Sequence, residues 1–167
     1  MAATAFGTAR EREHACAGVQ QELAARGVDY EVVRHDPSPT AVAEAHSCGV
    51  PLRRVVKTVA LHSGGRLVAV ALPASERINI QRVRQLLGDP DAELATEAEI
   101  AHELRALEPG ALPPFGAPAP PLVLVDRRVL SSKWVLAGGG DHRHSLRVSP
   151  LDIVRLSHAR VVDIAQS

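Results

Sequence analysis

Aromatic residues and cysteines are scarce in this sequence. Only 2% of its 167 residues are aromatic, and its two cysteines, Cys16 and Cys48, do not form a CxxC pair. We interpret both as reduced thiols of a cytosolic protein rather than as a disulfide. The chain is long enough to bury a core without disulfides or bound metal, and its length favours a single domain.

Net charge and long apolar runs are missing as well. The 19 basic residues balance the 19 acidic residues, which argues against binding of nucleic acid by bulk charge alone. Any contact with nucleic acid must therefore be local, or be helped by a partner. No basic start precedes an apolar run, so a signal peptide is not expected, and no stretch approaches the length that spans a bilayer. We expect a cytoplasmic protein that has neither membrane nor DNA as a partner.

Familiar catalytic motifs are absent too. The sequence contains no GxSxG, GxxxxGK[ST] or HExxH motif and no Rossmann glycine fingerprint. His142 and His144 could offer two metal ligands, but no further ligands stand at a recognisable spacing, so a solvated turn is the favoured interpretation. Asp126, Ser131 and Ser132 could be combined with a histidine into a triad, but any chain of this size allows that. We therefore expect neither a metal nor a cofactor.

The apolar residues that are present alternate between helical and extended patterns. Helices are expected over 11–26, from Thr40 to about Cys48, over 78–88, from Thr96 through Leu104, and from Ser149 onward. Strands are expected over 30–35, 54–62, 66–73, 121–126, 134–140 and 144–149, with 160–165 as a last strand or an extended tail. Because only three residues separate 54–62 from 66–73, these two strands should form an antiparallel hairpin. The pattern predicts an α+β domain over 11–167, with a mixed, largely antiparallel sheet and flanking helices, after a loosely ordered 1–10.

Three local features have more than one interpretation on the residues alone. Lys57 lies inside the apolar run RVVKTVAL, and it could face solvent or point into a cleft to hold a phosphate or carboxylate. The run Gly138-Gly139-Gly140 could be a hairpin turn or a cradle for a phosphate. The stretch GALPPFG (110–116) is stiff in the middle, where proline restricts φ, and permissive at both ends, where glycine does not. A simple linker would not need both properties.

An ordered set of motifs carries a family resemblance. HDPSPTAVAEAHSCGV, VVKTVAL, GALPPFG, LVLVD and AGGG…HSLRVSPLDIVRL together resemble the YbaK-like aminoacyl-tRNA deacylases, the free-standing relatives of the editing domain of bacterial prolyl-tRNA synthetases. The resemblance spans roughly 28–165. It implies the editing-domain fold, with a barrel-like sheet, and hydrolysis of the ester between a wrong amino acid and the 3′-terminal adenosine of tRNA.

The resemblance also implies roles for particular residues. Lys57 corresponds to the pocket lysine that helps to hold the tRNA end, and Gly110 to Pro114 correspond to the GxxxP loop. The backbone of that loop lines the aminoacyl pocket and positions the scissile carbonyl or the attacking water. The residues implied as catalytic are Lys57 and Gly110. Those implied as substrate-binding are His35, Thr58, Ala111, Leu112, Pro113, Pro114, Gly138, Gly139, Gly140 and Ser145.

Substrate and partner follow from the same resemblance. An aminoacyl ester is already activated, so the absence of a nucleophilic triad is consistent with a family in which the substrate's own groups assist. The implied substrate is mischarged tRNA, and the favoured one is tRNA-Pro that carries Cys, Ala or another small amino acid. Prolyl-tRNA synthetase is a candidate partner that would help to bind the tRNA. Val33 stands where some cysteine-specific relatives carry an aromatic residue, so the amino acid stays open. The alternative is a catalytically silent module that binds tRNA ends or a synthetase. Intact Lys57, Gly110 and Pro114 favour the enzyme.

Overall fold

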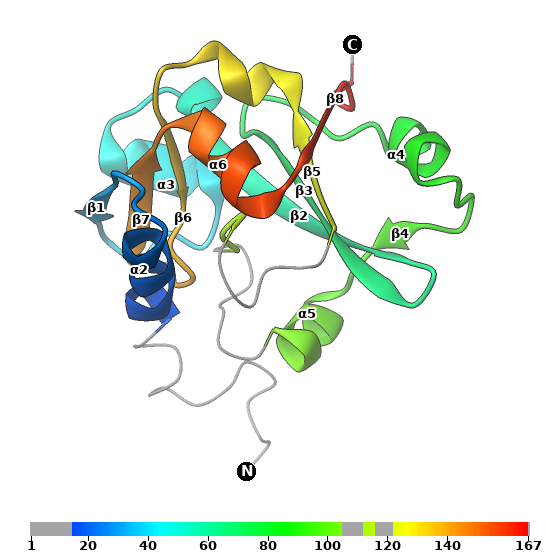
Figure 1. The fold of residues 1–167 in the computed structure, drawn as a ribbon, viewed down its shortest axis with the longest axis horizontal. Coiled ribbons are helices and arrows are strands. Elements are labelled where there is room, and N and C mark those ends of the chain that lie inside the picture. The colour runs from blue at the N-terminus through cyan, green and yellow to red at the C-terminus, as the bar shows by residue number, and fades with distance from the viewer. Residues whose placement is uncertain (1–14, 105–111, 116–121, 167) are drawn as a thin grey trace.

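A mixed β-sheet forms the centre of the computed structural model, which describes residues 15–104, 112–115 and 122–166 (Figure 1). The strands are β1 Glu31–Arg34, β2 Val55–Ser63, β3 Arg66–Pro73, β4 Glu93–Leu94, β5 Leu122–Asp126, β6 Val135–Gly138, β7 His144–Val148 and β8 Arg160–Val162. Their order across the sheet is β1-β7-β6-β2-β3-β5-β8, and β4 pairs with β2. The pairs β1–β7, β6–β7, β2–β3 and β2–β4 are antiparallel, whereas β2–β6, β3–β5 and β5–β8 are parallel. The predicted α+β class with a mixed sheet is confirmed.

The helices begin and end close to the positions that the sequence indicates. They are α2 Ala15–Ala25, α3 Ala41–Cys48, α4 Ile80–Leu87, α5 Glu97–Glu103 and α6 Pro150–Ser157, with 3₁₀ turns η1 Leu52–Arg54 and η2 Arg127–Ser131. Thr96 and Glu99 form the expected capping box of α5. The helix expected over 78–88 starts later, because Asn79 is its N-cap and accepts a hydrogen bond from the amide of Arg82. The start of the helix expected over 11–26, and the N-terminal segment 1–10, lie outside the described residues.

The hairpin expected between the two long apolar strands is confirmed. β2 and β3 pair from Ser63↔Arg66 back to Val56↔Pro73. The two residues between them, Gly64 and Gly65, have φ of 57° and 78°. Such positive φ values suit glycine and are what a tight two-residue hairpin turn requires.

Helices cover the sheet on both faces, and side chains of β2 alternate between them. Val55 lies on the face that α3 covers, whereas its neighbour Val56 packs with α2 and α6 on the opposite face. α4 joins α3 on the first face through Val83, and α5 joins α2 and α6 on the second through Ile100. Each residue of β2 is therefore assigned to a face by its position in the strand.

The described part of GALPPFG is buried on the second face. Leu112, Pro113, Pro114 and Phe115 are all buried. Phe115 is 1% exposed and packs in the same cluster as Val56, and Leu112 packs against α5. A buried Phe fixes the end of this segment on the sheet. The glycines of the stretch, Gly110 and Gly116, and Ala111 lie outside the described residues.

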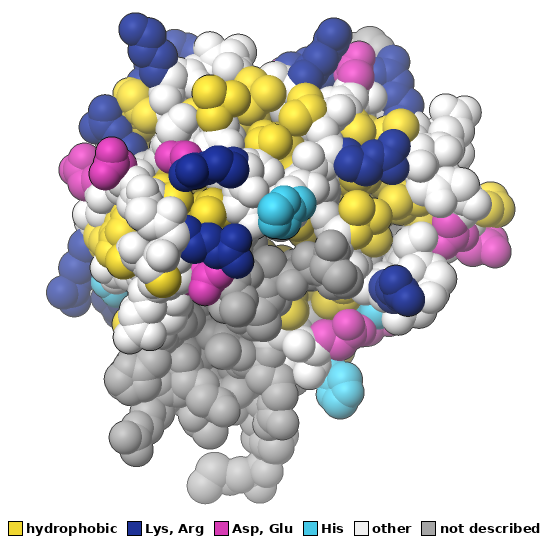
Figure 2. All heavy atoms as spheres, in the orientation of Figure 1, with side chains coloured by type: hydrophobic (Ala, Val, Ile, Leu, Met, Phe, Trp, Pro, Cys, Tyr) yellow, Lys and Arg dark blue, Asp and Glu magenta, His cyan; other side chains and the backbone are white. Residues whose placement is uncertain are grey.

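The surface carries charges of both signs. Figure 2 shows lysine and arginine side chains interspersed with acidic and apolar ones on that face, rather than gathered in one continuous basic field. None of the helices in the described part of the chain is long and apolar enough to cross a membrane.

Candidate functional site

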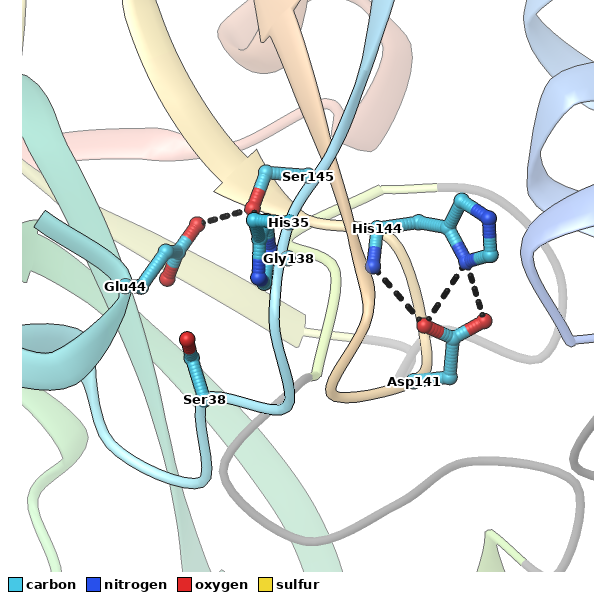
Figure 3. Close-up of a pocket in the computed structure, with 7 residues that line it drawn as sticks. All are labelled: His35, Ser38, Glu44, Gly138, Asp141, His144 and Ser145. Atoms are coloured by element: carbon cyan, nitrogen blue, oxygen red, sulfur yellow. Dashed lines mark hydrogen bonds and ion pairs between the residues drawn. The ribbon is translucent and has the colours of Figure 1, made fainter. Parts of the chain in front are cut away.

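A small pocket opens where the end of β1, α3 and the β6–β7 turn meet (Figure 3). The residues that line it are His35, Ser38, Glu44, Gly138, Asp141, His144 and Ser145. The space between them is about large enough for one water molecule. The lining residues come from two stretches about 100 positions apart in sequence, so only the paired strands β1 and β7 bring them together.

The segment between β1 and α3 is held against the β6–β7 turn by backbone hydrogen bonds. The amide of His35 donates to the carbonyl of Arg143 at 2.9 Å, and the amide of Ser38 donates to the carbonyl of His142 at 2.8 Å. Thr40 then caps α3 by accepting a hydrogen bond from the amide of Ala43 at 3.1 Å. Together these hydrogen bonds place Glu44, in the first turn of α3, against the sheet, where it is 8% exposed.

The glycine run shapes the β6–β7 turn. A Cβ on Gly139 would lie 2.7 Å from the carbonyl oxygen of His144, a distance that real Cβ atoms essentially never show. Gly140 has a φ of 97°, which favours glycine. Asp141 closes the turn by accepting hydrogen bonds from the amides of Arg143 and His144, at 2.7 Å and 2.9 Å. The geometry of the turn is therefore sufficient to explain why glycines occupy these positions, and their role as a phosphate cradle remains a prediction.

Three side chains form a hydrogen-bonded chain through the pocket. The Ser145 hydroxyl lies 2.5 Å from Oε1 of Glu44 and 2.8 Å from Nε2 of His35. Nδ1 of His35 lies 2.8 Å from the carbonyl oxygen of Asp36. Ser145 is 1% exposed. Burial raises the pKa of Glu44, while the Ser145 hydrogen bond and the nearby His35 act in the opposite direction.

Lys57 lies on the same face of the sheet as Ser145. In β2, Val55 pairs with Leu136 of β6, and Lys57, two positions further along the strand, has its side chain on the same face as Val55. Gly138, two positions after Leu136 in β6, pairs with Ser145 of β7.

The ammonium group of Lys57 is not simply solvated. Lys57 is half-buried, and its Nζ donates a hydrogen bond to the backbone carbonyl of Glu76. Burial lowers the pKa of Lys57, the positive charge of Arg77 lowers it further, and Glu76 raises it. Lys57 is therefore neither fully exposed nor fully buried, and its place in a substrate pocket remains a prediction.

Thr58 lies on the opposite face of β2 from Lys57. Its partner across the hairpin is Ala71, which belongs to the same cluster as Phe115. The Thr58 Oγ1 atom is buried and has no hydrogen-bond partner among the described residues. An unpaired buried hydroxyl costs about 1–3 kcal/mol, so this atom is a candidate for contact with a ligand or with the rest of the loop.

The expected site residues thus fall into two groups. His35, Lys57, Gly138 and Ser145 belong to the side of the sheet that α3 covers, whereas Thr58 and Leu112 belong to the other side. Gly110 and Ala111 lie outside the described residues, so their place in the site stays a prediction. Sequence reasoning missed Glu44, Ser38 and Asp141. Of these three, only Glu44 could have been found from the sequence, because an acidic residue on the buried face of a helix is unusual. It lies on the same face of α3 as Ala45, which packs in the core.

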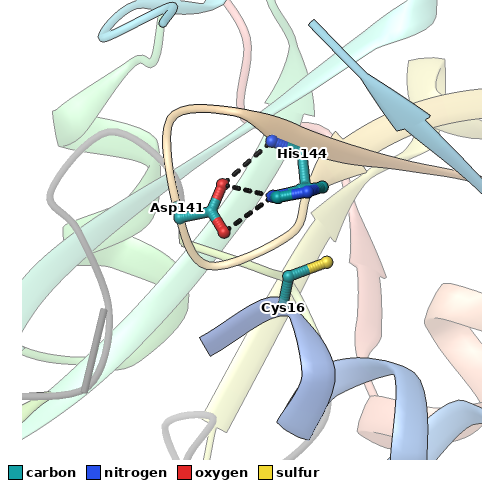
Figure 4. A group of neighbouring side chains, drawn as sticks. All are labelled: Cys16, Asp141 and His144. Atoms are coloured by element: carbon teal, nitrogen blue, oxygen red, sulfur yellow. Dashed lines mark hydrogen bonds and ion pairs between the residues drawn. The ribbon is translucent and has the colours of Figure 1, made fainter. Parts of the chain in front are cut away.

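Cys16, Asp141 and His144 lie close together, with one potential ligand atom of each within 4.8 Å of the others (Figure 4). Hydrogen bonds to each of the three residues already account for this arrangement. Asp141 binds two backbone amides and lies 2.9 Å from Nδ1 of His144, and Cys16 Sγ accepts a hydrogen bond from Gln20 at 3.3 Å. Burial raises the pKa of the Cys16 thiol, which disfavours the thiolate that a metal would need. We assign no ion to this group; it contains His144, but not His142.

Comparison with known proteins identifies the class. A family model described as an aminoacyl-tRNA editing domain matches residues 35–156. The chain therefore belongs to the aminoacyl-tRNA editing domain family. The YbaK-like resemblance and the fold class that it implied are confirmed.

The curated relatives are much longer proteins. A proline–tRNA ligase from Thiobacillus denitrificans is 36% identical over 110 residues, which cover 64% of this chain and 19% of the relative. A proline–tRNA ligase from Xanthomonas campestris pv. campestris is 29% identical over 126 residues, which cover 75% of this chain and 22% of the relative. The chain spans only about a fifth of the length of these relatives.

Solved structures share the fold over nearly the whole chain. A protein described only as hypothetical is 32% identical, with a TM-score of 0.81, over 89% of this chain and 99% of the other. A structure described provisionally as a trans-editing enzyme for prolyl-tRNA synthetase has a TM-score of 0.81 at 24% identity, over 92% of this chain and 98% of the other. At that identity, the second likeness supports the fold alone.

Proposed function

We propose that this protein hydrolyses the ester of mischarged aminoacyl-tRNA in trans, with tRNA-Pro that carries Cys, Ala or another small amino acid as the substrate. One observation carries the proposal: the aminoacyl-tRNA editing match covers 35–156, and every residue that lines the pocket lies inside it. The similarity to proline–tRNA ligases supports tRNA-Pro as the first tRNA to test.

In this proposal Lys57 and the GxxxP loop act on opposite parts of the substrate. Lys57 supplies a positive charge, partly shielded from water, for the 3′ end of the tRNA. The loop from Gly110 to Pro114 presents backbone groups to the scissile ester, and its prolines lower the entropy lost when the loop is ordered. A single preorganised donor of this kind contributes about 3 kcal/mol in other enzymes. The other expected substrate contacts, including His35, Thr58, Gly138, Gly139, Gly140 and Ser145, remain proposals.

The balanced charge bears on the partner. A chain with 19 basic and 19 acidic residues is expected to hold a whole tRNA weakly. We propose that prolyl-tRNA synthetase, or another tRNA-binding protein, delivers the tRNA to this domain.

The test is a deacylation screen of the purified chain against tRNAs that each carry one amino acid. The set contains tRNA-Pro charged with Pro, Cys, Ala or Ser, and each rate is compared with spontaneous hydrolysis of the same ester. We expect faster hydrolysis of at least one mischarged tRNA-Pro, with Pro-tRNA-Pro spared. Binding of charged tRNA without hydrolysis of any ester would instead establish the silent binding module.

A further inference from the structure

The hydrogen bonds that link Glu44, Ser145 and His35 need one hydrogen more than the Ser145 hydroxyl carries. The carbonyl of Asp36 only accepts hydrogen bonds, so Nδ1 of His35, which lies 2.8 Å away, carries a hydrogen. The Ser145 hydroxyl has one hydrogen but makes two contacts, with Glu44 Oε1 and with His35 Nε2. A second hydrogen is needed, and only the Glu44 carboxyl or Nε2 of His35 can supply it.

Two arrangements satisfy this count. In the first, His35 is an imidazolium that donates to Ser145, and Ser145 donates to the Glu44 carboxylate. In the second, Glu44 is a carboxylic acid that donates to Ser145, and Ser145 donates to neutral His35. Both carry the same total charge, so the proton can pass between Glu44 and His35 through the Ser145 hydroxyl without any charge entering or leaving the site.

The carboxyl group of Glu44 also lines the pocket. Only its Oε1 atom is used by the hydrogen bonds that the structure describes. Figure 3 shows its second carboxyl oxygen directed into the pocket, on the side of the Ser38 hydroxyl. The Ser38 hydroxyl is already bound to the carbonyl of Asp36 at 2.8 Å and to the hydroxyl of Ser47 at 3.1 Å. The second oxygen of Glu44 is therefore available to a small molecule in the pocket.

The surroundings of Glu44 favour a proton that is easily gained and lost. A buried carboxyl whose pKa is raised, next to a cationic partner that opposes the shift, is the arrangement that general acids and bases have in known enzymes. The titratable groups around it are His35 at the end of β1, Cys48 on α3 itself, Asp141 and His144 on the β6–β7 turn, and Lys57 on the same face of the sheet.

We propose that Glu44 is the proton-transfer residue of this site, with Ser145 and His35 as the relay that sets its charge. This inference rests on the proposed deacylation. In the imidazolium arrangement, the second oxygen of Glu44 takes a proton from water while the water oxygen bonds to the ester carbonyl carbon. When the bond from that carbon to the ribose oxygen breaks, Glu44 returns the proton to the ribose oxygen. The products are the free amino acid and the ribose hydroxyl, and Glu44 is again a carboxylate.

Glu44→Gln separates the chemistry from the architecture. The glutamine amide can donate to Ser145, which then donates to neutral His35, so the hydrogen-bonded chain survives. The glutamine takes no proton from water. We expect kcat to fall about 100-fold or more, which is within the usual contribution of general acid–base catalysis, at an unchanged KM and with a melting temperature no lower than that of the wild type. The rise of kcat with pH across the Glu44 titration in the wild type should also be lost. Glu97→Gln, an exposed glutamate on α5, is the matched control.

A readout without substrate tests the shared proton itself. In ¹⁵N NMR spectra of the His35 ring, the Nε2 signal of the wild type should reflect the hydrogen that it shares with Ser145 and Glu44. In Glu44→Gln, Nε2 should become that of a neutral ring with its hydrogen on Nδ1. An unchanged Nε2 signal overturns the relay. Wild-type turnover in Glu44→Gln overturns the catalytic role but leaves the proposed function standing. Absence of deacylation by the wild type on every tRNA overturns the proposed function, and the role of Glu44 with it.

Discussion

Asp126 and Glu44 are both buried carboxylates, yet they differ in the donors that surround them. Asp126, at the end of β5, is fully buried and accepts hydrogen bonds from the amides of Arg128, Ile164 and Ala165, at 2.9–3.0 Å. The Arg128 guanidinium adds contacts at 3.2 Å to both oxygens. Amides and guanidinium groups keep their hydrogens at any physiological pH. Asp126 therefore fixes the C-terminal segment to the sheet through donors that do not change.

Glu44 has different partners, a hydroxyl and through it an imidazole, whose hydrogens can move. One of its oxygens also faces a pocket instead of a backbone amide. Burial alone therefore does not mark a functional carboxylate in this domain. The distinction lies in whether the surrounding donors are permanent.

The largest effect on stability is expected for Asp126→Asn. The side-chain NH₂ group of Asn donates hydrogen bonds and cannot accept them. It would replace a carboxylate oxygen of Asp126, so backbone amides of the C-terminal segment would lose their acceptor. Removal of one partner from a buried ionic network costs about 3–5 kcal/mol. Urea denaturation should show a loss near that size, with Asp29→Asn, at an exposed position, as the control. A loss below about 1 kcal/mol would show that Asp126 is not a structural anchor.

Lys57→Ala should affect turnover and leave the fold intact. Lys57 makes its described hydrogen bond to a backbone carbonyl at the surface of the β3–α4 connection, not within a cluster of apolar residues. We expect deacylation of the substrate found in the screen to fall about 100-fold, the order of a lost electrostatic contact in a catalytic site. Lys133→Ala, at an exposed lysine, is the matched control. Near-wild-type turnover in Lys57→Ala would remove Lys57 from the site.

Gly110→Ala tests the loop that the sequence predicts to be catalytic. The added methyl group should block the ester or shift the loop, and small misplacements cost up to about 100-fold in rate. We expect a turnover loss of about tenfold or more at a nearly unchanged melting temperature. Gly18→Ala is the control, because a Cβ there meets no atom within 4 Å. Full activity of Gly110→Ala would make the loop a structural turn, and a collapse of the melting temperature would assign Gly110 to folding.

A smaller effect concerns the pH dependence of stability at Glu44. Because burial raises the folded-state pKa above its ordinary value of 4.5, the folded protein holds this proton more tightly than the unfolded chain does. The stabilisation is full below about pH 4.5 and is lost as pH rises through the folded pKa. Gln does not ionise, so the free energy of unfolding of Glu44→Gln should gain on that of the wild type as pH rises. Denaturation across that pH range, with Glu97→Gln alongside, measures the difference; a constant difference contradicts the raised pKa.

The smallest expected effect is that of metal removal. The hydrogen bonds of Asp141 account for its position beside Cys16 and His144, so activity should survive extensive EDTA treatment. The measurement is the deacylation rate before and after dialysis against EDTA. A loss that zinc reverses would make Cys16, Asp141 and His144 metal ligands, and would contradict a water activated by Glu44.

Much of the local structure could be predicted from neighbouring residues. The β2–β3 hairpin follows from two apolar runs around Gly64 and Gly65, and α5 from the Thr96–Glu99 capping box. These signals work because turn geometry and helix capping involve atoms only a few positions apart. The order of the strands has no such signal, since β6 pairs in parallel with β2 about 80 positions earlier.

The sequence by itself determined the class of the domain, its helices and strands, and its family, through local patterns and an ordered set of motifs. Only the tertiary structure decided which side chains meet. It decided that Lys57 lies on the face that α3 covers and Thr58 on the face of α2 and α6, because helix packing determines what each set of alternating strand residues meets. It brought Glu44 to Ser145 across 101 positions, and His35 to Ser145 across 110. Contacts over such separations depend on strand order and register, which the whole core determines and no single motif encodes.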